Sequence, residues 1–251
     1  MSTRSAVIVG ATRNLGLHVA IELDSRDWSV VGVGRSDMID TPAGRIRFER
    51  MDLGRPEAVN ELGALLRDVS PDLIVHNAVT YGSRSPGPQT LEGLETMFRV
   101  NTLIPYLCIS EYFDSQADAS KTSCVVINSD SIFHANRHVG SYAASKAALK
   151  VMTSAIADIC REKGGAVATL LLGPLADEQK LEECSRVAKK SGLTVEEVVK
   201  RFLRRSNPFI LRDRFFQADE CLRSIEYIYA LGAAANGMVC KLDGGSSGSL
   251  Y

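Results

Sequence analysis

A tyrosine and a lysine stand four residues apart at Tyr142 and Lys146. Residues with this spacing project from one face of a helix, so the phenol and the ammonium would lie close together. A positive charge near a phenol favours the ionised form and lowers its pKa from the usual value of about 10. We therefore expect Tyr142 to act as a general acid or base, with Lys146 adjusting its pKa.

A serine is placed where it could assist this pair. Ser129 ends the apolar run Val125–Ile127-Asn128-Ser129 and lies 13 residues before Tyr142. A hydroxyl at this position could donate a hydrogen bond to an oxygen that gains negative charge during a reaction. A catalytic role for Ser129 is implied by the family resemblance described below.

A glycine-bearing turn near the N-terminus is suited to bind phosphate. The segment Gly10-Ala11-Thr12-Arg13-Asn14-Leu15-Gly16 follows an apolar run and precedes an amphipathic stretch. Such a turn lets the backbone approach a pyrophosphate, and the following helix presents free N–H groups and the positive end of its dipole. Asn14 stands where a glycine could, because asparagine tolerates a left-handed φ. Two glycines with a purely structural role are the alternative.

Two arginines indicate which dinucleotide would bind. Arg35 comes directly after the apolar run Ser29–Gly34, where an acidic residue would bind the ribose 2′-hydroxyl of NAD. A guanidinium there suits a 2′-phosphate, and Arg13 adds a second cation inside the turn. The pattern favours NADP(H), although two solvated arginines remain an alternative.

Short apolar runs alternate with amphipathic stretches along the chain. Most of the runs are continuous rather than alternating, which is typical of strands buried on both faces of a parallel sheet. The predicted strands are Ala6–Gly10, Ser29–Gly34, Ile46–Met51, Leu73–Asn77, Cys124–Ser129, Val167–Leu172 and Met238–Leu242. The predicted helices are Leu15–Ser25, Pro56–Arg67, Leu91–Phe113, Ser141–Glu162 and Ala218–Leu231. We expect one α/β domain over residues 1–251, a doubly wound Rossmann-type fold with a mostly parallel seven-stranded sheet and helices on both faces.

These segments, in this order, resemble the short-chain dehydrogenase/reductase family. Gly10 and Gly16 match the outer glycines of its T-G-x-x-x-G-x-G turn, and the tyrosine–lysine pair matches its Y-x-x-x-K motif. His76-Asn77-Ala78-Val79 resembles the family's N-N-A-G, with His76 and Val79 as departures, and Lys241–Gly245 resembles its V-D-G-G. The resemblance runs from residue 6 to residue 245 and leaves only one segment unmatched.

The resemblance implies roles for individual residues. Asn101 matches the family's fourth catalytic residue and would hold a water in a proton relay. Tyr142 would exchange a proton with the substrate oxygen, Ser129 would hydrogen-bond that oxygen, and Lys146 would also bind the nicotinamide ribose. The residues that it implies for cofactor binding are Gly10, Thr12, Arg13, Asn14, Leu15, Gly16, Arg35, Asp52, Leu53, Asn77, Ala78, Tyr142, Lys146, Gly173 and Pro174. Asp177 or a neighbour stands where the family's nicotinamide-binding threonine is common.

The unmatched segment, residues 177–214, is long and charged. Its sequence Thr194-Val195-Glu196-Glu197 predicts a capping box that opens a helix with an apolar face of Val198, Val199, Phe202 and Leu203. We expect this insertion to be a substrate lid. Ten basic residues against six acidic ones lie between Glu178 and Arg214, which could attract an anionic or carrier-bound substrate. A solvated helix explains the surplus as well.

Loop residues near the predicted pocket are candidates for substrate contact. Tyr81, Ser131 and Phe133 are placed there by their positions after the fourth and fifth predicted strands. His134 and His138 are four residues apart, but zinc needs more ligands than two, so no metal site is predicted.

Charge and hydropathy exclude several partners. The 251 residues carry a net charge of −1, and no apolar run approaches the roughly 20 residues of a membrane span. We therefore expect no nucleic-acid or membrane partner. The six cysteines are scattered, and no secretion signal begins the chain, which favours a cytoplasmic location. The resemblance implies a homotetramer or homodimer joined through the long fourth and fifth helices.

The expected function is an NADPH-dependent ketoreductase, transferring hydride between the nicotinamide and a ketone or secondary alcohol. An enoyl or imine reductase on the same scaffold is one alternative, although the spacing of four between tyrosine and lysine favours carbonyl chemistry. A catalytically silent NADP(H)-sensing regulator is another. The substrate is not identified by the sequence.

Overall fold

The computed structural model describes residues 3–36, 45–81, 90–136, 139–207 and 209–248. Its core is a seven-stranded sheet in the order β3-β2-β1-β4-β5-β6-β7, with every pair parallel. The strands are β1 Ser5–Val9, β2 Ser29–Gly34, β3 Arg47–Arg50, β4 Leu73–His76, β5 Ser123–Ser129, β6 Ala166–Leu172 and β7 Val239–Leu242. This arrangement confirms the predicted doubly wound α/β fold.

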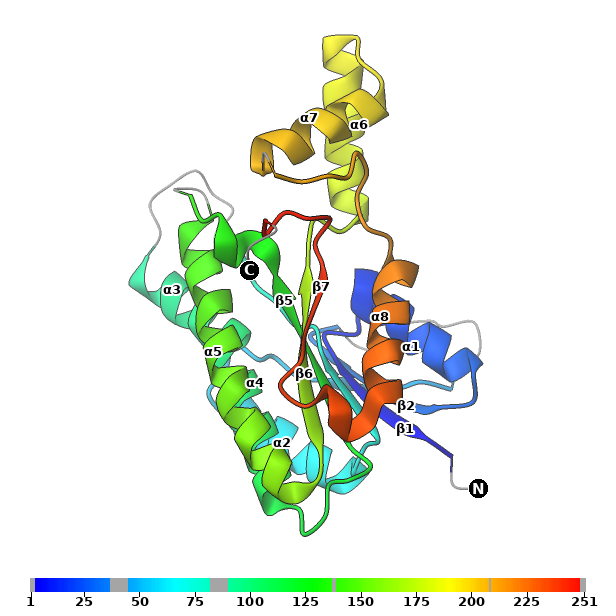
Figure 1. Ribbon diagram of the computed structural model, residues 1–251, viewed down its shortest axis with the longest axis vertical. Coiled ribbons are helices and arrows are strands. Elements are labelled where there is room, and N and C mark those ends of the chain that lie inside the picture. The colour runs from blue at the N-terminus through cyan, green and yellow to red at the C-terminus, as the bar shows by residue number, and fades with distance from the viewer. Residues whose placement is uncertain (1–2, 37–44, 82–89, 137–138, 208, 249–251) are drawn as a thin grey trace.

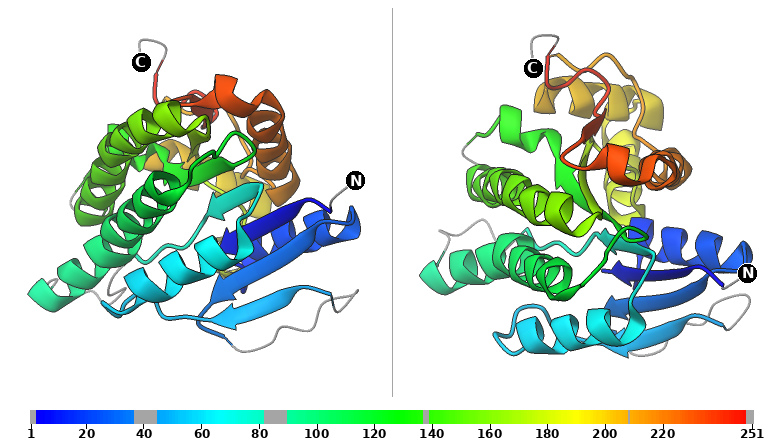
Figure 2. Two further views of the ribbon diagram at one scale, coloured as in Figure 1. Left: turned by 90° about the horizontal axis from the view of Figure 1, so that it is seen from below. Right: turned by 60° about the horizontal axis from the view of Figure 1, so that its bottom comes forward.

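Helices cover both faces of the sheet (Figures 1 and 2). The helices are α1 Asn14–Ser25, α2 Ala58–Val69, α3 Leu91–Phe98, α4 Ile104–Ser115, α5 Gly140–Lys163, α6 Glu178–Ser191, α7 Val195–Ser206 and α8 Ala218–Leu231. Short 3₁₀ turns follow β5 and α8, at Asp130–Phe133 and Gly232–Ala235. Figure 1 places α2, α4 and α5 on one side of the sheet and α1 and α8 on the other.

The two layers divide the side chains of the strands between two apolar cores. On β1, Val7 and Val9 belong to the core under α2, α4 and α5, whereas Ala6 and Ile8 belong to the core under α1 and α8. Successive side chains of a strand point to opposite faces, so a strand covered on both sides must be apolar throughout. This explains why the apolar runs of the sequence do not alternate.

One predicted helix is interrupted. The stretch expected as a single helix, Leu91–Phe113, forms α3, a five-residue π turn at Arg99–Leu103, and α4. Pro105 stands in the first turn of α4 and has no N–H to donate to the carbonyl of Asn101, four residues earlier. The helix widens at this point, and the wide turn carries Asn101.

The segment expected as a lid contains two helices rather than one. The capping box predicted at Thr194 is present, with the Thr194 hydroxyl accepting from the Glu197 N–H at 3.2 Å, and it opens α7. The sequence reading missed α6, which the Asp177 carboxylate caps at 2.8 Å from the Lys180 N–H and which ends at Gly192 with φ +70°. Figure 1 shows both helices beyond the ends of the strands.

Candidate active site

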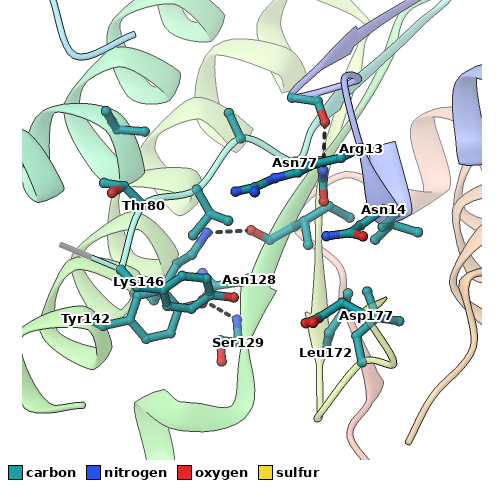
Figure 3. A pocket seen from close by; sticks show the side chains of 18 of the residues that line it. Arg13, Asn14, Asn77, Thr80, Asn128, Ser129, Tyr142, Lys146, Leu172 and Asp177 are labelled. Atoms are coloured by element: carbon teal, nitrogen blue, oxygen red, sulfur yellow. Dashed lines mark hydrogen bonds between the residues drawn. The ribbon is translucent and has the colours of Figure 1, made fainter. Parts of the chain in front are cut away.

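A cavity of about 780 Å³ lies at the carboxyl ends of the strands. It spans the place where the strand order reverses between β1 and β4, which is the usual binding position in doubly wound sheets. The predicted site residues that line it are Gly10, Thr12, Arg13, Asn14, Leu15, Arg35, Asp52, Leu53, Asn77, Ala78, Tyr81, Ser129, Tyr142, Lys146, Gly173 and Pro174. In Figure 3 the Tyr142 and Ser129 side chains lie across the cavity from Arg13 and Asn14.

Four predicted residues lie outside that lining. Gly16 packs against Gly10 within the glycine-bearing turn, and Asn101 hydrogen-bonds to Thr80 in the loop after β4. Ser131 is buried in the 3₁₀ turn after β5, and Phe133 packs under the Lys241 ammonium at 5.4 Å from its ring centre. Neither Ser131 nor Phe133 is among the described residues that line this cavity. His138 lies outside the described residues.

The glycine-bearing turn has the backbone geometry expected from its sequence. Asn14 has φ +48°, the left-handed conformation that its residue type tolerates, and Gly10 has φ +88°. A Cβ on Gly16 would lie 2.0 Å from the Gly10 carbonyl oxygen, and one on Gly10 would lie 2.7 Å from Ala78. The Asn77 amide donates to the Gly10 carbonyl at 3.1 Å, which ties the turn to the end of β4.

Cationic side chains lie at the far end of the cavity from Tyr142. Arg13 immediately precedes α1, Arg35 follows β2, and both are exposed. Asp52 and Leu53, after β3, line the same end. A group with negative charge would therefore meet two guanidiniums and the N-terminus of α1 here.

The other end of the cavity holds the tyrosine and the serine. Tyr142 lies in the first turn of α5, and Ser129 ends β5. Burial raises the pKa of Tyr142 well above its usual value, as does the neighbouring Tyr81, whose ring centre is 4.7 Å away. Hydrogen bonding with the Ser129 side chain acts in the opposite direction and lowers that pKa. The phenol is therefore protonated at neutral pH.

The Lys146 ammonium is held by the backbone of β5. It donates to the Ile127 carbonyl oxygen at 3.0 Å, and burial lowers its own pKa to about 8. The strand end fixes this position, because the Asn128 amide donates to the Lys146 carbonyl at 3.1 Å. Helix spacing places the two residues on one face, but the local carbonyl determines where the ammonium points.

Asn101 is a positioning residue by its contacts. Its amide nitrogen donates to the Thr80 carbonyl at 2.8 Å and to the Ser145 hydroxyl at 3.0 Å, and its oxygen accepts from the Thr80 N–H at 2.8 Å. Both amide protons are thus used within the protein, which leaves one lone pair for a water. The π turn holds the loop after β4 against α5 in this way.

Three residues near the site were given no role by the sequence pattern. Thr80 anchors the loop after β4 through Asn101, Asp130 follows Ser129 and lines the cavity, and His76 ends β4 in the buried interior. Asp177, which the sequence left open as a nicotinamide contact, caps α6 and pairs with the Lys180 ammonium at 2.6 Å. A polar residue at the end of each strand was the signal that could have drawn attention to Asp130.

Comparison with known proteins agrees with this geometry. The model of the short chain dehydrogenase family matches residues 4–180. The uncharacterized oxidoreductase YvaG of Bacillus subtilis (strain 168) is 20% identical over 259 aligned residues, covering 99% of this chain and 97% of that protein.

Solved structures share the fold over their full length. L-sorbose reductase of Gluconobacter frateurii, in complex with NADPH and L-sorbose, has a TM-score of 0.79 at 16% identity, with 100% of this chain and 98% of that chain covered. A 4-hydroxyisoleucine dehydrogenase in complex with NADH has a TM-score of 0.80 at 20% identity, with coverages of 98% and 100%. Within the described residues, none of the helices has the length and apolar character needed to span a membrane. The protein belongs to the short chain dehydrogenase family of oxidoreductases.

Proposed function

We propose that the protein is an NADP(H)-dependent oxidoreductase that interconverts a ketone and a secondary alcohol, with Tyr142 as its general acid and base. The observation that carries this proposal is the Tyr142 phenol beside the Ser129 hydroxyl, in a cavity that continues to the glycine-bearing turn. A protonated phenol is ready to donate to a carbonyl oxygen as that oxygen gains charge.

The residues of the cavity fit a nicotinamide dinucleotide. Gly10 and Gly16 let the turn pack tightly on itself and on Ala78, where a Cβ would clash, and this turn leads into the N-terminus of α1 beside the cavity. Arg35 follows β2 where a carboxylate would favour NAD, and it and Arg13 suit the 2′-phosphate of NADP(H). One similar structure binds NADPH and another NADH, so the cofactor preference is argued from these arginines. When bound, the nicotinamide supplies or accepts the hydride.

The chain's own residues then have distinct tasks. Tyr142 donates its proton to the carbonyl oxygen during reduction, and Ser129 donates a hydrogen bond that orients the same oxygen. Lys146 would contact the nicotinamide ribose, as the resemblance implies, and a positive charge drawn toward the phenol would lower the pKa of Tyr142 for the reverse reaction. Asn101 and Thr80 hold the loop that borders this end of the cavity. Residues 177–214 act as the lid over it, within a single domain.

Turnover and cofactor binding, measured together, test the proposal. Wild-type protein should oxidise NADPH in the presence of a ketone panel, and Tyr142→Phe should lower kcat/KM by about 100-fold or more. NADPH should still bind to Tyr142→Phe, because the glycine-bearing turn and Arg35 are unchanged in that variant. The matched variant Arg35→Asp should weaken NADPH binding relative to NADH while leaving the tyrosine chemistry in place.

The alternatives predict other results. NADPH binding without any ketone turnover that Tyr142→Phe abolishes would favour the silent sensor. Turnover of activated C=C or C=N substrates alone would favour the enoyl or imine reductase. Equal affinity of wild-type protein for NADPH and NADH would contradict the cofactor assignment.

A further inference from the structure

Asp130 is a carboxylate at the substrate end of the cavity. It directly follows Ser129, begins the 3₁₀ turn Asp130–Phe133, and lines the cavity although only 5% of its surface is exposed. Its negative charge is close enough to the Tyr142 phenol to contribute to the raised pKa of that group. The carboxylate therefore faces the space where a substrate oxygen would meet Tyr142 and Ser129.

The two carboxylate oxygens of Asp130 differ in their surroundings. Oδ2 accepts a hydrogen bond from the Ser246 hydroxyl and lies 3.3 Å from the His134 ring nitrogen Nε2. Among the residues that the structure describes, none donates a hydrogen bond to Oδ1. One oxygen thus fixes the side chain to the C-terminal segment, and the other remains an acceptor for a ligand.

The basic residues of the lid do not pair with the Asp130 carboxylate. Of the ten between Glu178 and Arg214, Lys180 alone is in the described cavity lining, and its ammonium is held by Asp177 at 2.6 Å and by the Leu175 carbonyl at 3.0 Å. Four others are bound to carboxylates elsewhere. These are Lys200 and Arg204 with Asp213, and Arg212 and Arg214 with Glu220.

The Lys146 ammonium does not pair with Asp130 either. Its ammonium points to the Ile127 carbonyl. The expectation of an anionic substrate, which rested on the positive surplus of the lid, therefore finds no support in the cavity itself.

We propose that Asp130 is a specificity-determining residue that selects ketones carrying a hydrogen-bond donor, a hydroxyl or an ammonium, close to the carbonyl, and disfavours a carboxylate there. The inference rests on the proposed carbonyl chemistry and names the substrate class for it. A buried acceptor that meets no donor has lost its hydration without replacement. The enzyme therefore binds the transition state of a substrate that lacks the donor less tightly. A substrate carboxylate at the same place would in addition be repelled by the like charge of Asp130.

Four phenyl ketones that differ in one group test this directly. The carbonyl carries CH₂OH in 2-hydroxyacetophenone and CH₂NH₃⁺ in 2-aminoacetophenone, and these are the two donor ketones. It carries an ethyl group in propiophenone and CH₂COO⁻ in benzoylacetate. Their phenyl ring suits the apolar wall that Val139, Leu172 and Phe202 provide. For wild-type protein, kcat/KM should be about ten-fold or more higher for the two donor ketones than for propiophenone, and lowest for benzoylacetate.

The variant Asp130→Asn should reverse the selectivity. Its amide oxygen can still accept from Ser246, while an amide nitrogen in place of Oδ1 presents a donor to the cavity. The ammonium ketone, which can only donate, should lose about ten-fold or more in kcat/KM relative to propiophenone, and benzoylacetate should gain. Ser246→Ala is the matched control, because it loosens the same contact but keeps the carboxylate, and it should retain the wild-type ranking.

The outcomes separate the two proposals. Absence of turnover for all four ketones with wild-type protein would overturn the proposed function. Turnover with no preference for the donor ketones would overturn the role of Asp130 alone, as would an unchanged ranking in a folded Asp130→Asn protein. Should that variant fail to fold, the wild-type ranking by itself still decides, since a preference for propiophenone or benzoylacetate contradicts the inference.

Discussion

His76 is a buried histidine at the end of β4, with 1% of its surface exposed. Among the described residues, neither of its ring nitrogens has a hydrogen-bond partner. Burial, assisted by the positive charge of Lys146, lowers the pKa of His76 to about 3. As the pH falls below 6.5, the unfolded chain begins to bind a proton at His76, whereas the folded protein keeps the imidazole neutral until the pH approaches about 3.

The first prediction concerns acid stability. Between the folded pKa of about 3 and the unfolded value of 6.5, the unfolded state binds the additional proton, so the free energy of unfolding falls as the pH falls through this window. His76 should contribute a loss of up to about 1.4 kcal/mol per pH unit. His76→Asn, which restores the residue type of the resembling motif, should reduce that slope. Urea unfolding at several pH values measures it, and equal slopes for both proteins would contradict the prediction.

Residue types and spacing indicated much of the candidate site but not its electrostatics. The turn from Gly10 to Gly16, Ser129 and Tyr142 could be named from sequence because each follows a strand or opens a helix. The pKa values could not, since they depend on which atoms bury each group. Lys146 illustrates this, because the Ile127 carbonyl that holds its ammonium lies 19 residues away on another element. Asp130 was missed for the same reason, and His76 was noted only as a departure from the family motif.

The elements were predictable where local patterns determine them. All seven strands were predicted from short apolar segments, most of them continuous, and the capping box at Thr194 indicated α7. The π turn could not be predicted from hydrophobic periodicity, because it depends on the N–H that Pro105 lacks. The helix α6 is mostly exposed and polar, so its apolar contacts with α7 could not be read from its own sequence.

The two lid helices have an apolar cluster of their own. It consists of Cys184, Ala188, Val198, Val199, Leu203, Ile210 and Phe215, separate from the two cores of the sheet. The lid joins the sheet through backbone hydrogen bonds between Phe216 and the strand-following segment at Pro174 and Ala176, and through the Asn207 amide, which donates to the Ser246 carbonyl at 2.7 Å. An element attached in this way can open without disturbing the sheet.

The second prediction follows from this separation. Leu203 is fully buried in the lid cluster, so Leu203→Ala should destabilise the lid by about 2–5 kcal/mol. Amide hydrogen exchange should accelerate in α6 and α7 by roughly 30-fold or more, and stay unchanged in β1, β4 and β5. Leu149→Ala, on α5 in the core of the sheet, is the matched control and should accelerate exchange throughout. Equal acceleration in lid and sheet with Leu203→Ala would show that the lid is not an independent unit.

At the scale of the whole molecule, a net charge of −1 conceals a segregated distribution. The Arg13 and Arg35 guanidiniums and the Asp130 carboxylate line different parts of one cavity, and four of the lid's ten basic residues pair with acidic residues outside it. An electrostatic gradient along a single cavity can orient a dinucleotide and a polar substrate without any large net charge.

Apolar side chains on the outer helices provide the last prediction. The helices α4 and α5 pack beside each other, and both leave apolar side chains in solvent, with Leu107 44% and Val151 73% exposed. A two-fold assembly would bury the same patch on both copies, which is the usual arrangement in homo-oligomers. We propose that the protein is a homodimer or homotetramer through this surface, and that Leu107→Glu with Val151→Glu lowers its solution mass to that of one chain. Sedimentation measures the mass, and Leu211→Glu, at an exposed position away from these helices, should leave it unchanged. A wild-type monomer, or a double variant that stays assembled, would contradict this surface as the interface.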